Sequence, residues 1–157
     1  SNLSLDTVQN PDCLAFVLKM QTDAAAILRE AGLQVTAQRA SVYRCVHALH
    51  HATADEIAES VRGEIGTVSR QSVYDSLATL TGHGLIRRFQ PAGSSARYEM
   101  RVDNHHHLMC RSCGAMRDVD CAKGKAPCLH PVEDHGYRID EAEVIYWGLC
   151  PQCQSQD

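Results

Sequence analysis

The chain has 157 residues, of which 44% are hydrophobic and 22% are charged, and its formal net charge is -4 at pH 7. The length allows one or two small domains, and the apolar fraction is ordinary for a globular protein. The negative charge excludes a general polyanion binder, so any DNA contact must come from local basic patches.

Residues 1–20 are expected to form an irregular leader before the first regular element. No apolar signal segment or membrane span is visible in the sequence, so we expect a cytoplasmic location. In that reducing compartment, metal binding by the eight cysteines is favoured over disulfides. Disulfides and simple core packing remain the alternatives.

Helical periodicity begins at residue 23. The first helix is expected to end at Gly32, and Thr36 can cap a second. Thr53 and Glu56 form a capping-box sequence that opens a third helix. Ser69 can cap a fourth, which runs to Gly82. The apolar positions expected on these helices are Ala24, Ile27, Leu28, Ala31, Ala40, Val42, Tyr43, Val46, Leu49, Ile57, Ala58, Val61, Val73, Tyr74, Leu77 and Leu80.

A β-hairpin is predicted after the helices. Residues 85–89 and 96–100 have strand composition, and the segment 91–95 contains the proline, glycine and serines of a turn. Several short helices followed by a hairpin are typical of a winged helix-turn-helix, in which the last helix enters the DNA major groove. The alternative is a helical domain with a solvated polar face.

The opening of the fourth helix carries residues that suit base recognition. Arg70 can pair with guanine, Gln71 with adenine, and the Tyr74 ring can touch a thymine methyl. Arg87 and Arg88 lie where a wing would meet phosphate.

Two C-x-x-C pairs stand near the end of the chain. Cys110 and Cys113 form the first, with Gly114 directly after them, and Cys150 and Cys153 form the second. Each pair can offer two thiolates to one tetrahedral Zn²⁺, and together they complete a four-thiolate shell. The glycine allows the backbone to turn back around a metal. We therefore predict a structural zinc site.

A histidine run precedes the first cysteine pair. On a strand, His105 and His107 point to one face and His106 to the other. Imidazole nitrogens suit iron, zinc, nickel and copper, so the run is a second candidate metal site.

Four further cysteines have no metal-binding spacing. Cys13 lies in the leader. Cys45 is expected on a helix, with its side chain packed in the protein core. Cys121 and Cys128 flank a segment with two lysines, which could favour their thiolates and allow a thiol switch. The alternative is two packed or surface cysteines.

Several motifs together resemble the ferric uptake regulator (Fur) family. The resemblance covers residues 22–153 and is similar in detail to the actinobacterial FurA/CatR branch of PerR-like peroxide regulators. It rests on the segments 33–39, 53–57, 69–74, 105–114, 120–122, 126–129 and 140–153, which include both cysteine pairs and the histidine run.

The resemblance implies an α+β homodimeric repressor that binds double-stranded operator DNA. A winged-helix domain would cover residues 21–92, with its wing reaching about residue 100, and an α/β dimerisation domain would cover 101–157. Arg39 joins the candidate DNA contacts. The zinc ligands implied are the four cysteines named above. The implied regulatory site, for Fe²⁺ or Mn²⁺, consists of His51, Glu99, His105, His107 and Asp118, of which His51 and His105 would be the oxidation-prone ligands.

The sequence departs from the family pattern in ways that bear on metal choice. Peroxide-sensing members usually have Asp where Glu99 stands, whereas Asp118 matches their pattern. A third metal site of some iron sensors would need other residues at His106 and Ala142, although His135 could donate instead. We expect a non-enzymatic, iron-dependent peroxide sensor that represses catalase-type genes. The alternatives are an iron-, zinc- or nickel-responsive repressor of uptake genes, or a small metal-binding redox protein.

Overall fold

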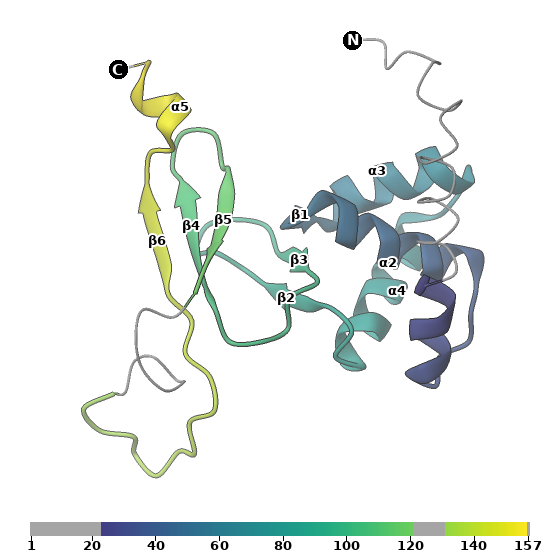
Figure 1. Cartoon of the computed structure of the whole chain (residues 1–157), viewed down its shortest axis with the longest axis horizontal. Helices are drawn as coiled ribbons and strands as arrows, with labels where there is room; N and C mark the ends of the chain where they lie inside the picture. The colour runs from purple at the N-terminus through teal and green to yellow at the C-terminus, as the bar shows by residue number, and fades with distance from the viewer. Residues whose placement is uncertain (1–22, 121–130, 157) are drawn as a thin grey trace. The chain divides into compact units, whose positions relative to one another are not determined.

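The protein is described by a computed structural model at residues 23–120 and 131–156. The chain divides into two compact units, Ser1–Val102 and Asp103–Asp157, which Figure 1 colours from purple to teal and from green to yellow. The predicted α+β class is confirmed, since the first unit is mainly helical and the second is built on a sheet. The leader, Cys13, Cys121 and Cys128 lie outside the described residues.

The helices of the first unit begin where their capping residues predict. Residues 23–30 are helical, and three further helices follow: α2 (Ala37–Leu49), α3 (Ala54–Ile65) and α4 (Arg70–Gly82). The side chains of Thr36, Thr53 and Ser69 each accept a backbone N–H from the first turn of their helix. Each cap satisfies an N–H group that has no partner within its own helix.

The core of the first unit is formed by one apolar stripe from each helix. Leu28, Val46, Ile57 and Leu77 are among the residues with 0% exposure. The prediction that Leu49 belongs to this core is wrong, because its side chain is 41% exposed. Leu49 is the last residue of α2, and its side chain extends past the end of the buried stripe.

A small antiparallel sheet joins the wing to the helices. The predicted hairpin is present as β2 (Arg87–Phe89) and β3 (Arg97–Glu99). A third strand, β1 (Ala52–Thr53), pairs with the other edge of β3 and gives the order β1-β3-β2. Two residues are too few to show strand periodicity, so the sequence does not predict β1. Its pairing brings the residue before it, His51, to the side of β3.

The second unit contains a mixed sheet with the order β5-β4-β6. Its strands are β4 (His106–Cys110), β5 (Met116–Val119) and β6 (Ile145–Gly148), and the short helix α5 (Pro151–Gln154) follows β6. β5 runs antiparallel to β4, and β6 runs parallel to it. β5 and β6 are separated in the sequence, and both pair with the central strand β4.

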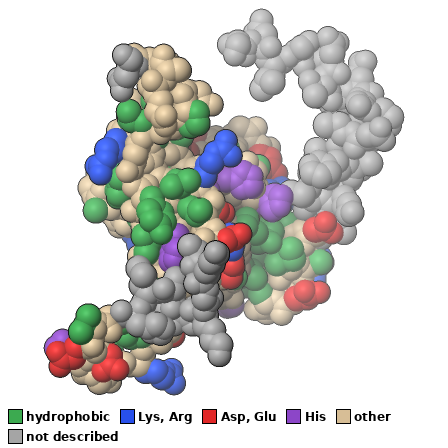
Figure 2. All heavy atoms as spheres, turned by 60° about the vertical axis from the view of Figure 1, so that its left-hand side comes forward, with side chains coloured by type: hydrophobic (Ala, Val, Ile, Leu, Met, Phe, Trp, Pro, Cys, Tyr) green, Lys and Arg blue, Asp and Glu red, His purple; other side chains and the backbone are tan. Residues whose placement is uncertain are grey.

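One face of the second unit carries exposed apolar side chains. Leu108 and Tyr146 are partners in the register of β4 and β6 and are 45% and 48% exposed. Figure 2 shows hydrophobic side chains gathered on the face of this unit that is turned toward the viewer.

None of the helices in the described part of the chain is long and apolar enough to cross a membrane.

Candidate metal centres and nucleic-acid interface

The four cysteines of the two C-x-x-C pairs come together at one end of the second sheet. Cys110 ends β4, and a tight turn carries Cys113 back toward it, with Gly114 at φ 74°. Cys150 is the N-cap of α5 and Cys153 lies inside that helix. The left-handed backbone at Gly114 is one that residues with a Cβ rarely adopt, as the sequence predicts for this turn.

The spacing of the sulfur atoms fits a tetrahedral metal ion. All four Sγ atoms lie within 4.8 Å of one another, and the Sγ atoms of Cys113 and Cys150 are 3.7 Å apart. A zinc ion with Zn–S bonds of about 2.3 Å requires sulfur–sulfur separations of about 3.8 Å. The cysteines therefore match a four-thiolate zinc site, and disulfide pairing is absent among the described cysteines.

The local hydrogen bonds favour thiolate at one end of this cluster. Backbone N–H groups of Cys113 and Cys150 lower the pKa of Cys110 to about 6, and the Cys150 N–H lies 3.3 Å from its Sγ. At Cys153 the Ser112 hydroxyl favours the thiolate, but the neighbouring Cys150 and Cys113 thiols outweigh it and raise the pKa to about 12. Complete ionisation of the cluster therefore calls for a compensating cation.

Three of the predicted regulatory ligands lie together in the second unit. The Nε2 atoms of His105 and His107 are 3.2 Å apart, and both face Asp118 Oδ1, at 3.5 Å and 3.4 Å. Ligands bonded to a metal at about 2.1 Å are separated by about 3.0–3.4 Å. Both imidazoles have 0% exposure. This set, the second-unit triad, thus has the spacing and the mixed nitrogen and oxygen chemistry of a divalent metal site.

The other ring nitrogens of the two histidines face oxygen atoms of neighbouring residues. His105 Nδ1 lies 2.9 Å from the Asp103 carbonyl oxygen, and His107 Nδ1 lies 3.6 Å from Glu143 Oε1. Such outer carbonyl and carboxylate groups orient metal-binding imidazoles. His106 points to the opposite face of β4, as predicted, where its Nδ1 accepts the Val144 N–H at 3.2 Å.

The remaining two predicted ligands form a pair inside the first unit. His51 Nε2 lies 3.3 Å from Glu99 Oε2, and Glu99 is only 3% exposed. The Phe89 ring packs edge-on against the imidazole, with 6.0 Å between ring centroids. A nearly buried carboxylate beside an imidazole offers one oxygen and one nitrogen ligand for a divalent metal, and we call these two residues the first-unit pair.

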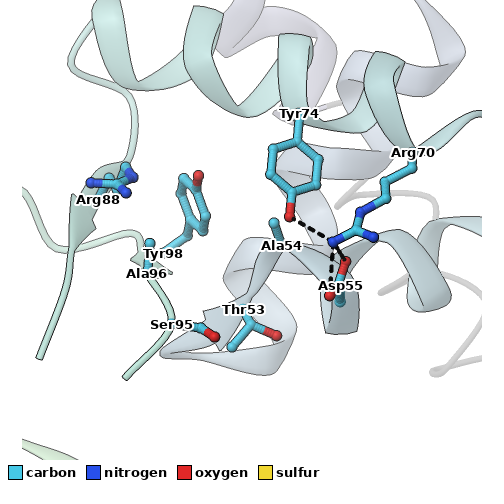
Figure 3. A pocket seen from close by; sticks show the side chains of 9 residues that line it. All are labelled: Thr53, Ala54, Asp55, Arg70, Tyr74, Arg88, Ser95, Ala96 and Tyr98. Atoms are coloured by element: carbon cyan, nitrogen blue, oxygen red, sulfur yellow. Dashed lines mark hydrogen bonds and ion pairs between the residues drawn. The ribbon is translucent and has the colours of Figure 1, made fainter. Parts of the chain in front are cut away.

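Three of the predicted DNA-contacting residues, Arg70, Tyr74 and Arg88, line a pocket of about 310 Å³ between α4, the start of α3 and the wing. Figure 3 shows Tyr74 and Arg70 on one side of this pocket and Arg88 on the other. Arg70 Nη2 lies 2.9 Å from Asp55 Oδ1 and 3.3 Å from the Tyr74 hydroxyl. Its guanidinium stacks over the Tyr74 ring at 5.5 Å. Asp55 and Tyr74 therefore hold this arginine in place.

Other predicted DNA contacts are anchored in a similar way. Gln71 donates to Asp75 Oδ1 at 2.9 Å, one helical turn further along α4. Arg88 donates to Gln90 Oε1 at 3.1 Å, and Arg39 donates to the Gln34 carbonyl at 2.6 Å.

Two predicted residues lie outside these sites. Cys45 is buried, as predicted, where its thiol donates to the Ser60 hydroxyl at 3.3 Å. Burial raises its pKa, so it stays a packed thiol. His135 is an exposed residue 3.6 Å from Glu133. Neither is part of a metal-binding cluster among the described residues.

Comparisons with known proteins identify the family of the chain. The family model for the ferric uptake regulator family matches residues 30–147. The transcriptional regulator FurA of Mycobacterium tuberculosis is 55% identical over 136 residues, covering 86% of this chain and 92% of the relative. The peroxide-responsive repressor PerR of Staphylococcus aureus is 27% identical over 140 residues, covering 85% of this chain and 91% of the relative.

Solved structures show the same fold at low sequence identity. A zinc uptake regulator in complex with zinc and DNA matches with a TM-score of 0.65 and 20% identity, over 88% of this chain and 95% of that one. The Helicobacter pylori ferric uptake regulator Fur, described with three functional metal-binding sites, matches with a TM-score of 0.62 and 21% identity, over 87% of this chain and 92% of that one.

The family match, together with two groups of metal-ligand residues, identifies a metal-responsive transcriptional regulator rather than an enzyme. The chain belongs to the ferric uptake regulator family, and its sequence is similar to the mycobacterial FurA regulators. This confirms the family resemblance expected from the sequence.

Proposed function

We propose that the chain is a homodimeric, iron-dependent transcriptional repressor that senses peroxide. The observation that supports this proposal is that each unit holds part of the expected ligand set. The first-unit pair, His51 and Glu99, and the second-unit triad each have atoms spaced for a shared divalent ion. An ion bound by both sets stabilises the conformations in which they meet. Metal occupancy thereby shifts the population toward one inter-domain arrangement.

The cysteine cluster has a structural role in this proposal. Its sulfur spacing matches zinc, and it joins the end of β4 to α5, which are separated by about 40 residues. A metal site that ties distant segments contributes its binding energy to folding. The cluster therefore stabilises the sheet that presents the second-unit triad.

DNA binding is assigned to α4 and the wing. Arg70 and Tyr74 lie on the exposed side of α4, held by the contacts to Asp55, and Arg88 lies across the pocket from them. The exposed Leu108 and Tyr146 on the second sheet are suited to pairing with a second copy. Two copies related by a twofold axis would place two α4 helices on the half-sites of a pseudo-palindromic, AT-rich operator.

Peroxide sensing is supported by the mixed nitrogen and oxygen ligands and by similarity to PerR and FurA proteins. Ferrous iron held by this set would supply the electrons that split the O–O bond of peroxide. In the net reaction, one peroxide would transfer an oxygen atom to an imidazole carbon of His51 or His105 and leave as water. The imidazole would supply the two electrons consumed, so the iron would end in its ferrous state. An oxidised imidazole is a poorer ligand, so the inter-domain ligand set is lost and the protein releases DNA.

A repressor of metal-uptake genes is the second candidate. Glu99 favours it, since peroxide-sensing members usually carry Asp at this position. A metal-uptake role would use the same ligands and the same DNA surface without ligand oxidation. The two functions differ in the response to peroxide and share the requirement for metal.

The proposed DNA surface is tested by single substitutions on α4 and on the wing. We expect Tyr74→Ala and Arg70→Ala to weaken binding of the manganese-loaded protein to its operator by about 1–3 kcal/mol each, because each removes a base contact. Arg87→Ala should weaken binding to all sequences and reduce the salt slope by about one unit. Fluorescence anisotropy at several salt concentrations measures both effects.

The matched control is Arg62→Ala. Arg62 is an arginine of α3 that pairs with Glu59 at 3.0 Å, and it lies outside the pocket-lining set. Its loss should leave operator affinity within about twofold. Unchanged affinity in all of the α4 and wing variants would place the DNA-binding surface elsewhere.

A further inference from the structure

The backbone at His51 has an unusual conformation. α2 ends at Leu49 and β1 begins at Ala52, so only two residues turn the chain between them. Both residues, His50 and His51, have φ of 46°. Residues with side chains rarely adopt positive φ, and such conformations persist only where surrounding contacts impose them. One of these residues, His51, is a member of the first-unit pair.

Contacts from the wing hold His51 in this conformation. Arg97 Nη1 donates to the His51 carbonyl oxygen at 2.9 Å, across 46 positions of sequence. Pairing of Ala52 with Tyr98 fixes the next residue of the chain, and the Phe89 ring contacts the imidazole from the other strand of the hairpin. The guanidinium of Arg97 is thus a charged group that reaches the His51 backbone directly.

Arg97 and Glu99 act on the two ends of the same histidine. They are two positions apart on β3, so their side chains leave the strand on one face. Arg97 binds the His51 carbonyl, and Glu99 Oε2 lies 3.3 Å from the His51 Nε2. The hydrogen bond to the carbonyl fixes the peptide group between His51 and Ala52. The backbone of His51 is then held in the conformation from which its imidazole reaches Glu99.

We propose that Arg97 is a positioning residue for divalent-metal binding, acting through the backbone of His51. The inference rests on the proposed function, in which His51 and Glu99 bind the regulatory metal. Loss of Arg97 frees His51 to leave its left-handed conformation, so the first-unit pair is no longer preorganised.

The direction in which metal affinity changes when Arg97 is removed distinguishes a positioning role from simple electrostatics. Arg97 is a cation in the same unit as a proposed cation site, so Coulomb repulsion alone predicts tighter metal binding once Arg97 is removed. Positioning predicts the opposite, that binding weakens although a positive charge has been lost.

The test is a Mn²⁺ titration of the full chain with zinc in the cysteine cluster, followed by the electron paramagnetic resonance signal of free Mn²⁺. We expect Arg97→Met to weaken Mn²⁺ binding by about 10–100-fold, the usual effect of losing a group that orients a ligand. Arg97→Lys keeps one donor and should lose less than Arg97→Met. Arg62→Met removes an arginine of α3 that pairs with Glu59 at 3.0 Å, and should leave Mn²⁺ affinity within about twofold.

Two further variants show whether Arg97 acts through His51. In a His51→Ala background, Arg97→Met should have no additional effect. Unchanged or tighter Mn²⁺ binding by Arg97→Met overturns the proposal, and so does an equal loss in the His51→Ala background. If circular dichroism shows that Arg97→Met is unfolded, the decision passes to Arg97→Lys, for which wild-type affinity overturns the proposal and a partial loss supports it. Wild-type affinity in His51→Ala itself would instead refute the proposed ligand set.

Discussion

Replacing Cys110 with serine is expected to unfold the second unit and to abolish dimer formation. Its sheet has three strands of four or five residues and exposes Leu108 and Tyr146, so it has little apolar core of its own. A structural zinc site of this type supplies about 10–16 kcal/mol of binding free energy that is coupled to folding. A serine hydroxyl is a poor zinc ligand, and the three remaining thiolates do not complete the shell.

The same result is expected for Cys153→Ser. Cys110 and Cys153 belong to different C-x-x-C pairs, and each supplies one of the four thiolates of the cluster. Metal analysis should find about one tightly held zinc per chain in the wild type after dialysis, and none in either variant. Size-exclusion chromatography and thermal melting give the oligomeric and folded states. Cys45→Ala is the control, since Cys45 is buried in the first unit against Ser60. It should keep its zinc and lose about 1–2 kcal/mol of stability. Serine variants that dimerise and melt like the wild type would refute the zinc assignment.

Replacing His107 with asparagine is expected to abolish metal-dependent DNA binding. His107 Nε2 lies 3.4 Å from Asp118 and 3.2 Å from His105 Nε2, at the centre of the second-unit triad. Loss of this nitrogen should weaken Mn²⁺ binding by on the order of 100-fold or more, since loss of an outer-shell group alone costs 10–100-fold. Without bound metal, the population shift toward the DNA-binding conformation is lost.

The neighbouring histidine provides a matched control for this variant. His106 is also buried, at 2% exposure, but it lies on the other face of β4 and accepts the Val144 N–H. Asparagine at position 106 can keep an acceptor for that N–H, so His106→Asn should retain Mn²⁺ and operator binding within a few fold. Mn²⁺ titration and anisotropy measure both variants. Equal losses at positions 106 and 107 would mean that the strand has been disrupted rather than a ligand removed.

Local signals in the sequence were sufficient for the caps, the cysteine shell and the shared face of His105 and His107. Each depends on spacing within one element or on ligand chemistry. The strand β1 and the roles of Asp55, Arg97 and Glu143 depend on tertiary pairing. Arg97, for example, reaches His51 only because β1 pairs with β3, and neither position suggests the other in the sequence. The exposure of Leu49 likewise follows from where α2 ends.

Asp75 is an acidic residue of α4 that contacts one of the predicted base-reading side chains. An acid on a DNA-reading helix disfavours close approach of phosphate. In the structure its Oδ1 accepts a hydrogen bond from Gln71 at 2.9 Å, so the acid orients a neighbouring amide on α4. Asp55 has the same relation to Arg70 at 2.9 Å. Two of the predicted base-reading side chains are therefore fixed by carboxylates before DNA arrives, which lowers the entropy lost on binding.

The central claim is that bound iron makes the repressor sensitive to peroxide through its own histidine ligands. The most direct measurement exposes the Fe²⁺ and Mn²⁺ forms to brief, stoichiometric peroxide under otherwise anaerobic conditions, and follows operator binding and peptide masses in the same samples. The account predicts that only the Fe²⁺ form releases DNA, with a gain of one oxygen on the peptides containing His51 or His105. Equal release of DNA by both metal forms, accompanied by new disulfides, would contradict it and indicate a thiol switch instead.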